Sequence, residues 1–284
     1  MSKRHEIKSR IATLTEIKGI LNAMKNLALL EIRKLDIFLT TQQRVVSSIE
    51  TASLDFLTFY SQPPQLSAES FHQLWIIIGS ERGFCGDFNK ALHQFVQSHA
   101  QQENRLLLVV GNRLRTKFQD DQQVVAFLDG HSVTEEIHTT LLHLTEVLNS
   151  LHQQFPLKKI GSISAVYYDD ETCAVKLRQL IPLAASQKRT TFSNPPTLNL
   201  EPSLFWSQLT DHFLYAALHE AFYTSLMVEN QMRLEHMEKA IQRLEKNEIQ
   251  LSLDYNKVRQ EEIIEEIEVI LLSAEALSET SSSE

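Results

Sequence analysis

The residues that could do chemistry gather in one short loop, Gly79-Ser-Glu-Arg-Gly-Phe-Cys-Gly-Asp87, directly after the apolar run at 74–78. A glycine-rich turn between a strand and a helix can hold a phosphate group on its backbone N–H groups. The glycine spacing here matches neither GxGxxG nor the Walker pattern, and Glu81 and Asp87 would repel an anion. The sequence therefore favours a turn required by the fold, with a nucleotide-binding enzyme as the alternative that this loop leaves open.

Cys85 is the one candidate nucleophile in that loop. The motif offers no neighbouring base that would activate the thiol, so a small packing residue is the better interpretation. The histidines lack the spacing of metal ligands, and no GxSxG, HExxH or paired-carboxylate motif stands out. We expect no catalytic residue, no metal site and no cofactor in this chain.

Two long helices are predicted to flank the segment that carries this loop. Residues 1–62 contain no proline and only Gly19, and residues 203–284 contain neither glycine nor proline. Both residue types weaken or break helix interiors, and apolar residues recur here at the three- and four-residue spacing of a coiled-coil seam. The seam positions are Ile7, Ile11, Leu14, Leu21, Met24, Ala28, Ile32, Leu35 and Leu39 in the first segment, and Leu234, Met237, Ile241, Leu244, Leu251, Tyr255 and Val258 in the second. Periodicity alone allows either an extended antiparallel pair or two helices of a bundle.

Charge favours the antiparallel pair. Residues 1–62 carry a net charge of +3 and residues 203–284 a net charge of −10, so the two segments attract each other. The chain as a whole has a net charge of −9, which argues against nucleic acid as a partner because phosphate binding needs clustered Lys and Arg. The cluster Glu261, Glu262, Glu265, Glu266 and Glu268 is either a solvated helix face or a docking surface for a basic partner.

The middle of the chain has the pattern of a small α/β domain. Six of the seven glycines lie between Gly79 and Gly161, and short apolar runs alternate with helical stretches. We predict strands at 74–78, 106–110, 124–127, 160–168 and 175–181, and helices at 88–100 and 133–155. The predicted class is α/β, with a Rossmann-like domain at 63–202 inserted between the coiled-coil helices at 1–62 and 203–284.

Composition and the termini place the chain outside the lipid bilayer and in a reducing compartment. No apolar run approaches the ~18 residues of a membrane span, and the polar N-terminus lacks the apolar core of a signal peptide. Cys85 and Cys173 are the only cysteines, so no disulfide framework is expected.

Three motifs together resemble the gamma subunit of F-type ATP synthases. They are the N-terminal positions Ile20, Ala23, Met24, Lys25, Ala28, Arg33 and Lys34, the loop Ser80-Glu-Arg-Gly-Phe-Cys-Gly-Asp-Phe-Asn89, and Tyr255-Asn-Lys-Val-Arg-Gln260. The resemblance implies a rotor whose coiled coil turns inside a hexamer of alpha and beta subunits, with the α/β domain against the epsilon subunit and the membrane c-ring. It further implies a peripheral position on the cytoplasmic face of a bacterial inner membrane.

The resemblance also implies site residues. It marks Met24, Arg33, Tyr255, Asn256, Arg259 and Gln260 as rotor contacts with the hexamer, and Arg82, Gly83, Cys85 and Gly86 as the signature of the α/β-domain loop. Met24 has a seam residue as its alternative interpretation, and Arg259 a surface helix charge. Among the departures from the family pattern are Glu31 in place of a lysine, Asp87 in place of a glycine, and a more acidic and more apolar C-terminal helix. The competing interpretation is a coiled-coil scaffold that displays an α/β interaction domain and self-associates through its seam.

Overall fold

A computed structural model of the chain divides into two compact units, and it describes residues 3–60, 72–99, 104–154, 160–170, 172–183 and 197–281. Residues 28–234 form the sheet unit, and residues 1–27 with 235–284 form the two-helix unit. In the part of the chain that is described, no helix combines the length and the apolar composition needed to cross a membrane.

The sheet unit is built on five strands: β1 His72–Ile78, β2 Arg105–Val110, β3 Val124–Leu128, β4 Ile160–Tyr168 and β5 Val175–Ile181. Their order is β3-β2-β1-β4-β5, with β5 antiparallel to β4 and every other pair parallel. This is the mostly parallel sheet with a terminal strand pair that the sequence predicts. The parallel strands are joined through helices, as parallel pairing requires a crossover connection.

The helices are α2 Phe88–Ser98, α3 Asn112–Arg115, the 3-10 turn η1 Thr134–Glu136 and α4 Ile137–Gln154 between strands, and the long helices α1 Lys3–Phe59 and α5 Pro202–Ser281 at the two ends. The predicted helices at 88–100 and 133–155 appear as α2 and as η1 with α4, while the short α3 was not predicted. The α/β class with flanking long helices is therefore confirmed.

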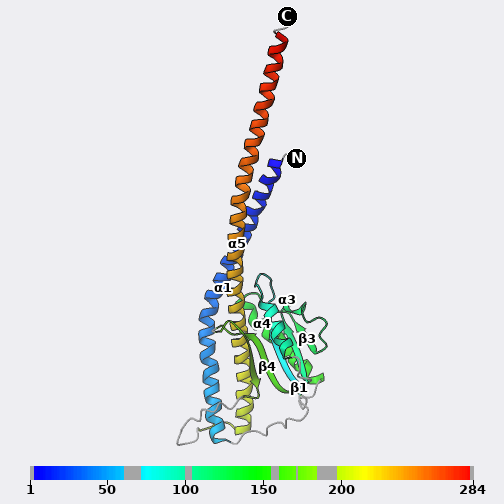
Figure 1. Ribbon diagram of the computed structural model, residues 1–284. Helices are drawn as coiled ribbons and strands as arrows, with labels where there is room; N and C mark the ends of the chain where they lie inside the picture. The colour runs from blue at the N-terminus through cyan, green and yellow to red at the C-terminus, as the bar shows by residue number, and fades with distance from the viewer. Residues whose placement is uncertain are drawn as a thin grey trace. The chain divides into compact units, whose positions relative to one another are not determined.

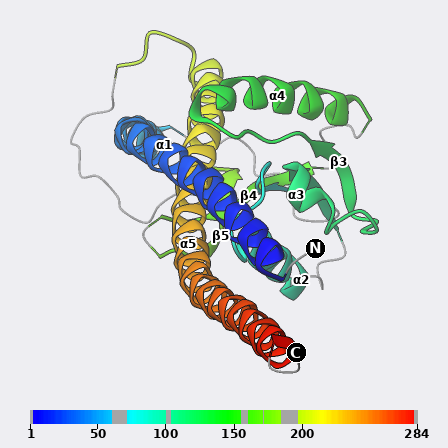
Figure 2. The same cartoon turned by 90° about the horizontal axis from the view of Figure 1, so that it is seen from above.

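The sheet has a separate apolar core on each face because successive side chains of a strand point to opposite sides. Leu74, Ile76 and Ile78 of β1 pack with residues of α1, α4 and α5 on one face. Trp75 and Ile77 pack with residues of α2 and with Leu114 of α3 on the other. Figure 2 shows α4 on one side of the sheet and α2 and α3 on the opposite side.

Within the sheet unit, residues 28–59 of α1 and 202–234 of α5 lie antiparallel. Phe38 of α1 stacks on Tyr223 of α5, and Phe56 stacks on Trp206, so positions rise along one helix as they fall along the other. These parts of both helices also contribute side chains to the apolar core on the first face of the sheet. They therefore belong to the same compact unit as the sheet. The three-part division at 1–62, 63–202 and 203–284 stays a prediction of domain boundaries.

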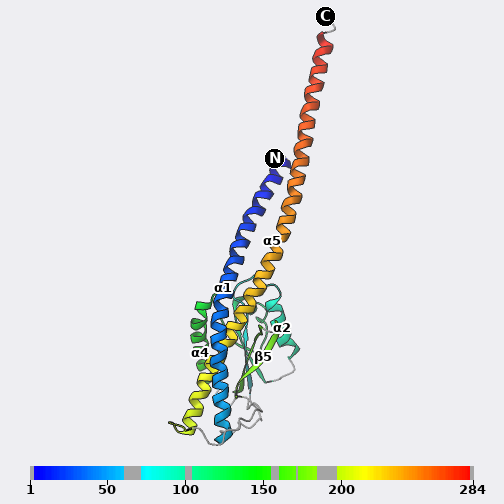
Figure 3. The same ribbon diagram turned by 90° about the vertical axis from the view of Figure 1, so that its left-hand side faces the viewer.

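The two-helix unit is an antiparallel pair held by a narrow apolar seam and by ion pairs. Leu21, Met237 and Ile241 are buried together, with Met24 and Leu244 packed against them. Three lysine or arginine side chains of α1 reach glutamates of α5: Arg4 to Glu262 at 3.6 Å, Lys18 to Glu245 at 3.0 Å and Lys25 to Glu238 at 3.4 Å. The opposite net charges of the two segments thus form ion pairs between the helices, as the sequence predicts. Figures 1 and 3 show this helix pair, made of the N-terminal part of α1 and the C-terminal part of α5.

Candidate functional site

The loop between β1 and α2 is held closed by its own polar side chains. The Ser80 N–H donates to Asn89 Oδ1 at 3.1 Å, and Asn89 Nδ2 donates to Ser80 Oγ at 2.7 Å. Asn89 is in the first turn of α2, so its amide fixes the start of that helix against the end of β1. Both Ser80 and Asn89 are buried.

The Glu81 carboxylate, in the loop after β1, binds backbone donors at the carboxyl ends of the two neighbouring strands β2 and β3. Its Oε2 accepts the Asn112 N–H at 3.0 Å and the Gly130 N–H at 2.8 Å, and its Oε1 accepts from the Asn112 side chain. Burial acts to raise the pKa of Glu81, but these hydrogen bonds outweigh it and the pKa is lowered. A carboxylate of the chain itself thus binds backbone donors at the carboxyl edge of the sheet, on the side of β1 away from the β1/β4 position where the strand order reverses.

Gly111 permits this close packing. Its φ is +100°, a conformation that side chains disfavour, and an added Cβ would lie 2.7 Å from the Ser80 carbonyl oxygen. The loops after β1 and β2 can therefore approach each other only if this residue is glycine.

Cys85 is a buried packing residue in the structure. Its side chain is 3% exposed, and its Sγ lies 3.4 Å from Ser80 Oγ. Burial raises the pKa of the Cys85 thiol, and the nearby Glu229 carboxylate acts in the same direction. A thiol with a raised pKa and no access to solvent is a poor nucleophile, which agrees with the packing role.

Of the remaining loop residues, Gly83 contacts α5, whereas Arg82 and Phe84 are exposed to solvent. Gly83 contributes its carbonyl oxygen as an acceptor for Arg233 Nε of α5 at 3.4 Å. Arg82 is exposed, Phe84 is 54% exposed with a φ of +64°, and Gly86 has a φ of +60°. A left-handed backbone conformation costs a non-glycine residue about 1–2 kcal/mol, so the backbone conformation that exposes the Phe84 ring to solvent is energetically unfavourable by itself.

Sequence reasoning missed the two α5 residues beneath this loop. Arg233 forms an ion pair with Glu229, and its Nη1 donates to Asn230 Oδ1 at 2.8 Å. Glu229 is 2% exposed, and burial raises its pKa even though Arg233 acts to lower it. Their only sequence signal is a set of polar residues on an otherwise apolar stretch of α5.

The predicted contacts of α1 lie in different surroundings. Met24 is half-buried and packs against the Leu21, Met237 and Ile241 cluster, so it occupies the seam. Arg33 belongs to the sheet unit and is exposed. A seam position and a contact with a hexamer are compatible for Met24, because a half-buried side chain still offers part of its surface.

The predicted contacts of α5 share one face of the helix. Asn256, Arg259 and Gln260 are exposed and spaced three and four residues apart, which places them side by side. Tyr255 is half-buried, and its hydroxyl accepts a hydrogen bond from Arg4 Nε at 3.0 Å. This bond from Arg4 lowers the pKa of Tyr255 and ties α1 to α5 beside the exposed face.

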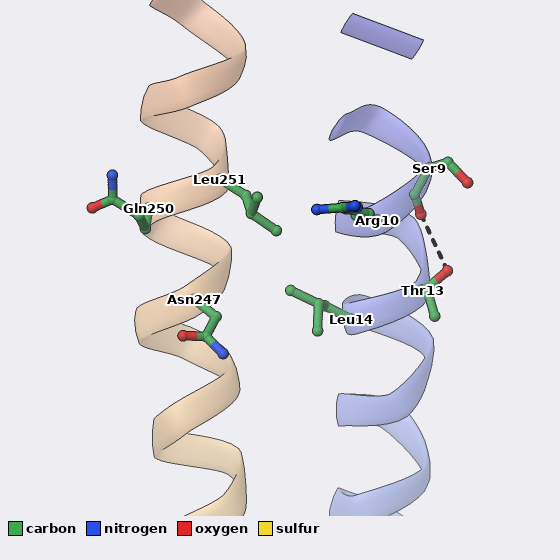
Figure 4. A pocket seen from close by; sticks show the side chains of 7 residues that line it. All are labelled: Ser9, Arg10, Thr13, Leu14, Asn247, Gln250 and Leu251. Carbon is green, nitrogen blue, oxygen red and sulfur yellow. Dashed lines mark hydrogen bonds between the residues drawn. The ribbon is translucent and has the colours of Figure 1, made fainter. Parts of the chain in front are cut away.

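A cavity of about 500 Å³ lies between α1 and α5 in the two-helix unit. Figure 4 shows Leu14 and Leu251 pointing toward each other across it, while Thr13 donates to the Ser9 carbonyl oxygen at 3.1 Å within α1. Its other lining residues are Arg10, Asn247 and Gln250. This set contains no acid–base pair and no nucleophile with a base, so the cavity is a gap in the seam rather than a reaction site.

Glu31 acts as a cap in the sheet unit. Its Oε2 accepts the Thr134 N–H at 3.0 Å and the Thr134 hydroxyl at 2.8 Å, and Lys34 bridges Glu31 and Glu135. Glu31 is 8% exposed, so this departure from the expected lysine is a structural link between α1 and the start of η1.

No group of histidine, cysteine or carboxylate side chains that could hold a metal ion occurs among the described residues.

Comparisons with known proteins cover almost the whole chain. A family model described as ATP synthase matches residues 3–277. The ATP synthase gamma chain of Clostridium botulinum (strain Langeland) is 24% identical over 284 residues, covering 95% of this chain and 96% of the relative. The gamma chain of Mycoplasma mycoides subsp. mycoides SC is 23% identical over 279 residues, covering 96% and 98%.

Solved structures show the same fold. A chain of the Euglena gracilis mitochondrial ATP synthase, in a structure of its OSCP, F1 and c-ring, superposes with a TM-score of 0.64 at 15% identity and covers 96% of this chain and 94% of its own length. A chain from the rotor of the same enzyme gives a TM-score of 0.62 at 14% identity, covering 92% and 98%. At this identity the likeness is one of fold.

Proposed function

The chain belongs to the gamma-subunit family of F-type ATP synthases, whose members form the central-stalk rotor, and we propose that it couples ion flow to ATP chemistry without a catalytic site of its own. The observation that carries the proposal is the antiparallel pairing of α1 and α5 with complementary charge, in a chain that the family model matches from residue 3 to 277. Such a pair resists bending and twisting better than one helix.

The loop supports a role without catalysis. The backbone donors that could hold a phosphate, at Ser80, Asn112 and Gly130, already bind oxygen atoms of Asn89 and Glu81. A nucleotide would have to displace a carboxylate with a lowered pKa, which stays charged near neutral pH and repels phosphate. ATP chemistry is therefore assigned to the alpha and beta subunits of the complex.

The rotor contacts are proposed on the exposed faces of the shaft. Asn256, Arg259 and Gln260 present one polar, cationic patch suited to an acidic or amide-bearing loop of a catalytic subunit. Met24 and Arg33 are the corresponding contacts on α1, and Tyr255 positions the α5 patch through Arg4. An asymmetric shaft biases each catalytic subunit differently because its contact energy differs between their open and closed states.

The remaining partners are the epsilon subunit and the membrane c-ring, with the complex on the cytoplasmic face of a bacterial inner membrane. The Euglena structure that superposes on this chain contains a c-ring, which supports that contact. The relatives from Clostridium and Mycoplasma support the bacterial setting.

Co-expression of this chain with the alpha and beta subunits of its source tests the proposal. We expect one copy per three alpha and three beta subunits on size exclusion, with ATPase activity that depends on this chain. Arg259→Glu should lower turnover without changing the helix content of the isolated subunit, while Lys257→Glu on the next face serves as a matched control. A chain that self-associates and never joins the hexamer would favour the scaffold, and stabilisation of the isolated chain by a nucleotide would favour an enzyme.

A further inference from the structure

A buried ion pair lies where α5 meets the tip of the β1–α2 loop. Glu229 and Arg233 are 2% and 6% exposed, stand one turn apart on α5, and are joined by a hydrogen bond from Arg233 Nη2 to Glu229 Oε1. Arg233 also reaches the loop, because its Nε donates to the Gly83 carbonyl oxygen at 3.4 Å. All three residues belong to the sheet unit. The ionisable pair is therefore part of the joint between the helix and the loop.

The tip of the loop, residues 83–86, is held less firmly than its base. At the base, the Ser80 N–H is bound by Asn89 and the Gly130 N–H by Glu81. At the tip, the bond from Arg233 to Gly83 is long for a hydrogen bond, and the backbone of the exposed Phe84 has a φ of +64°. A short exposed segment with such contacts opens locally at a lower free energy than the whole fold.

The groups around Glu229 decide which of its protonation states the closed joint favours. Burial acts to raise the pKa of Glu229, and the neighbouring Arg233 acts to lower it. In the β1–α2 loop, the Glu81 carboxylate acts to raise this pKa and the Arg82 guanidinium acts to lower it. Burial outweighs the attraction of Arg233 and raises the pKa of Glu229 to about 7.

The remaining charged groups near the pair face other partners or solvent. His131, in the loop after β3, acts on the pKa of Glu81. The stacking of Phe38 on Tyr223 fixes which residues of α1 come level with Glu229, and the charged ones among them are Glu31, Arg33 and Lys34. The first and the last of these pair with each other and bind the start of η1, and the second is exposed.

Loss of the proton from Glu229 weakens the joint, whereas its presence does not. A protonated Glu229 still offers an oxygen acceptor, and Arg233 keeps its bonds to Asn230 Oδ1 and to the Gly83 carbonyl oxygen. A charged Glu229 stays buried with Arg233 as its one ion-pair partner in the described part of the chain, and only opening lets water reach it. Because the closed joint binds the proton more tightly than the open joint, a rise in pH through neutrality favours opening.

We propose that Glu229 and Arg233 form a proton-sensitive joint, which holds the tip of the β1–α2 loop on α5 more firmly below neutral pH than above it. The joint sets how closely the exposed Arg82 and Phe84 follow α5. Its contacts lie within one chain, so the inference goes beyond the rotor function and does not depend on it.

Cys85 can report on this opening, because it belongs to the tip and its side chain is 3% exposed. Cys173→Ser removes the other thiol of the full chain, and the rate at which N-ethylmaleimide alkylates Cys85 then measures the open fraction. The rate is compared at each pH with that of the same chain carrying Glu229→Gln, which has no charge to lose. The thiol's own titration cancels in this ratio. Glu220→Gln is the matched control, because it removes another carboxylate of α5 that pairs with an arginine, Arg178.

We expect the ratio of the wild-type rate to the Glu229→Gln rate to rise about tenfold between pH 6 and pH 8.5, from a pKa of about 7 in the closed joint and 4.5 in water. The Glu220→Gln chain should follow the wild type. A ratio that stays constant or falls overturns the joint, and so does a Glu220→Gln chain that behaves like Glu229→Gln.

Hydrogen exchange of the wild-type chain tests the joint without any variant. After correction for intrinsic rates, amides of residues 82–86 should gain about tenfold in exchange over amides of β2 between the same two pH values. Equal behaviour of the two segments overturns the joint even if Glu229→Gln does not fold. Either failure leaves the rotor function standing, because assembly with the alpha and beta subunits is measured separately.

Discussion

Arg178 of β5 connects the sheet to both long helices within the sheet unit, and its replacement tests how firmly they are joined. Its Nη1 lies 2.7 Å from Glu220 Oε2 of α5, and its Nη2 lies 2.9 Å from Glu50 Oε1 of α1. The side chains of Arg178 and Glu220 are only 19% and 17% exposed. Arg178→Met keeps most of the apolar stem but leaves Glu220 with a largely buried, unpaired charge.

The expected loss follows from this partial burial. An exposed ion pair contributes about 0.2–1 kcal/mol, while removal of one partner of a buried pair costs about 3–5 kcal/mol. The Arg178 pair lies between these limits, so we expect the free energy of unfolding to fall by about 2 kcal/mol. With a urea dependence of about 2 kcal/mol per molar, the unfolding midpoint should drop by about 1 M.

The assay is urea unfolding of the full chain, followed by tryptophan fluorescence. Trp75 and Trp206 both belong to the sheet unit, so the emission reports on that unit. Arg178→Met, Glu220→Gln and the double variant form a cycle whose coupling should be at least about 1 kcal/mol. Lys176→Met is the matched control, because Lys176 is on the same strand and pairs with Asp169 at 3.1 Å but is 51% exposed.

Two results would refute this reasoning. Single losses that add up to the loss in the double variant within about 0.3 kcal/mol would show that Arg178 and Glu220 do not act together. A loss in Lys176→Met as large as in Arg178→Met would show that burial of the pair does not set the cost.

Three further predictions concern the fold, its pH dependence and the shaft. Burial lowers the pKa of His131 to about 4 against the opposing effect of Glu81, so the folded chain should lose about 3 kcal/mol as pH falls from 6.5 to 4. His131→Gln should remove that part of the acid sensitivity, and urea midpoints with the same pH dependence as the wild type would contradict it. Glu31→Ala should cost about 1–2 kcal/mol by leaving the Thr134 donors without their acceptor, whereas Glu31→Gln, whose amide oxygen still accepts, should lose less in the same assay. Leu244→Pro should cost about 3 kcal/mol or more in α5 and abolish ATP-driven ion pumping by the complex, with Leu244→Met as its control; full pumping by the proline variant would show that an unbroken α5 is not required.

Sequence patterns were sufficient for the elements because their causes are local. The absence of glycine and proline over 203–284 predicts a helix, and the structure has α5 from Pro202 to Ser281. Apolar runs at 74–78 and 106–110 predict buried strands, which appear as β1 and β2. Each of these signals depends on neighbouring residues, so no tertiary information was needed.

The polar contacts could not be predicted because their partners are far apart in sequence. Glu31 binds a residue 103 positions away, and Arg178 reaches partners 42 and 128 positions away. A glutamate in a helical segment is typical of a solvated surface, and only the packing of α1 beside η1 buries Glu31. In the loop, the sequence predicts that Glu81 disfavours an anion, but its role as the acceptor for two other loops depends on the order of the strands and could not be predicted.

The contacts of the β1–α2 loop explain how a motif that holds the fold together can mark a family. Within the loop, Ser80 and Asn89 set its shape and Glu81 binds backbone donors of the loops after β2 and β3, so the polar groups of the loop are used in holding the fold. Gly83 is joined to α5 through Arg233, whose charge is balanced by the buried Glu229. Because the loop is bonded to α5 at this point, a rotation of this part of α5 moves the loop with it. The exposed Phe84 and Arg82 then move with α5, so the motif attaches this loop mechanically to the helix.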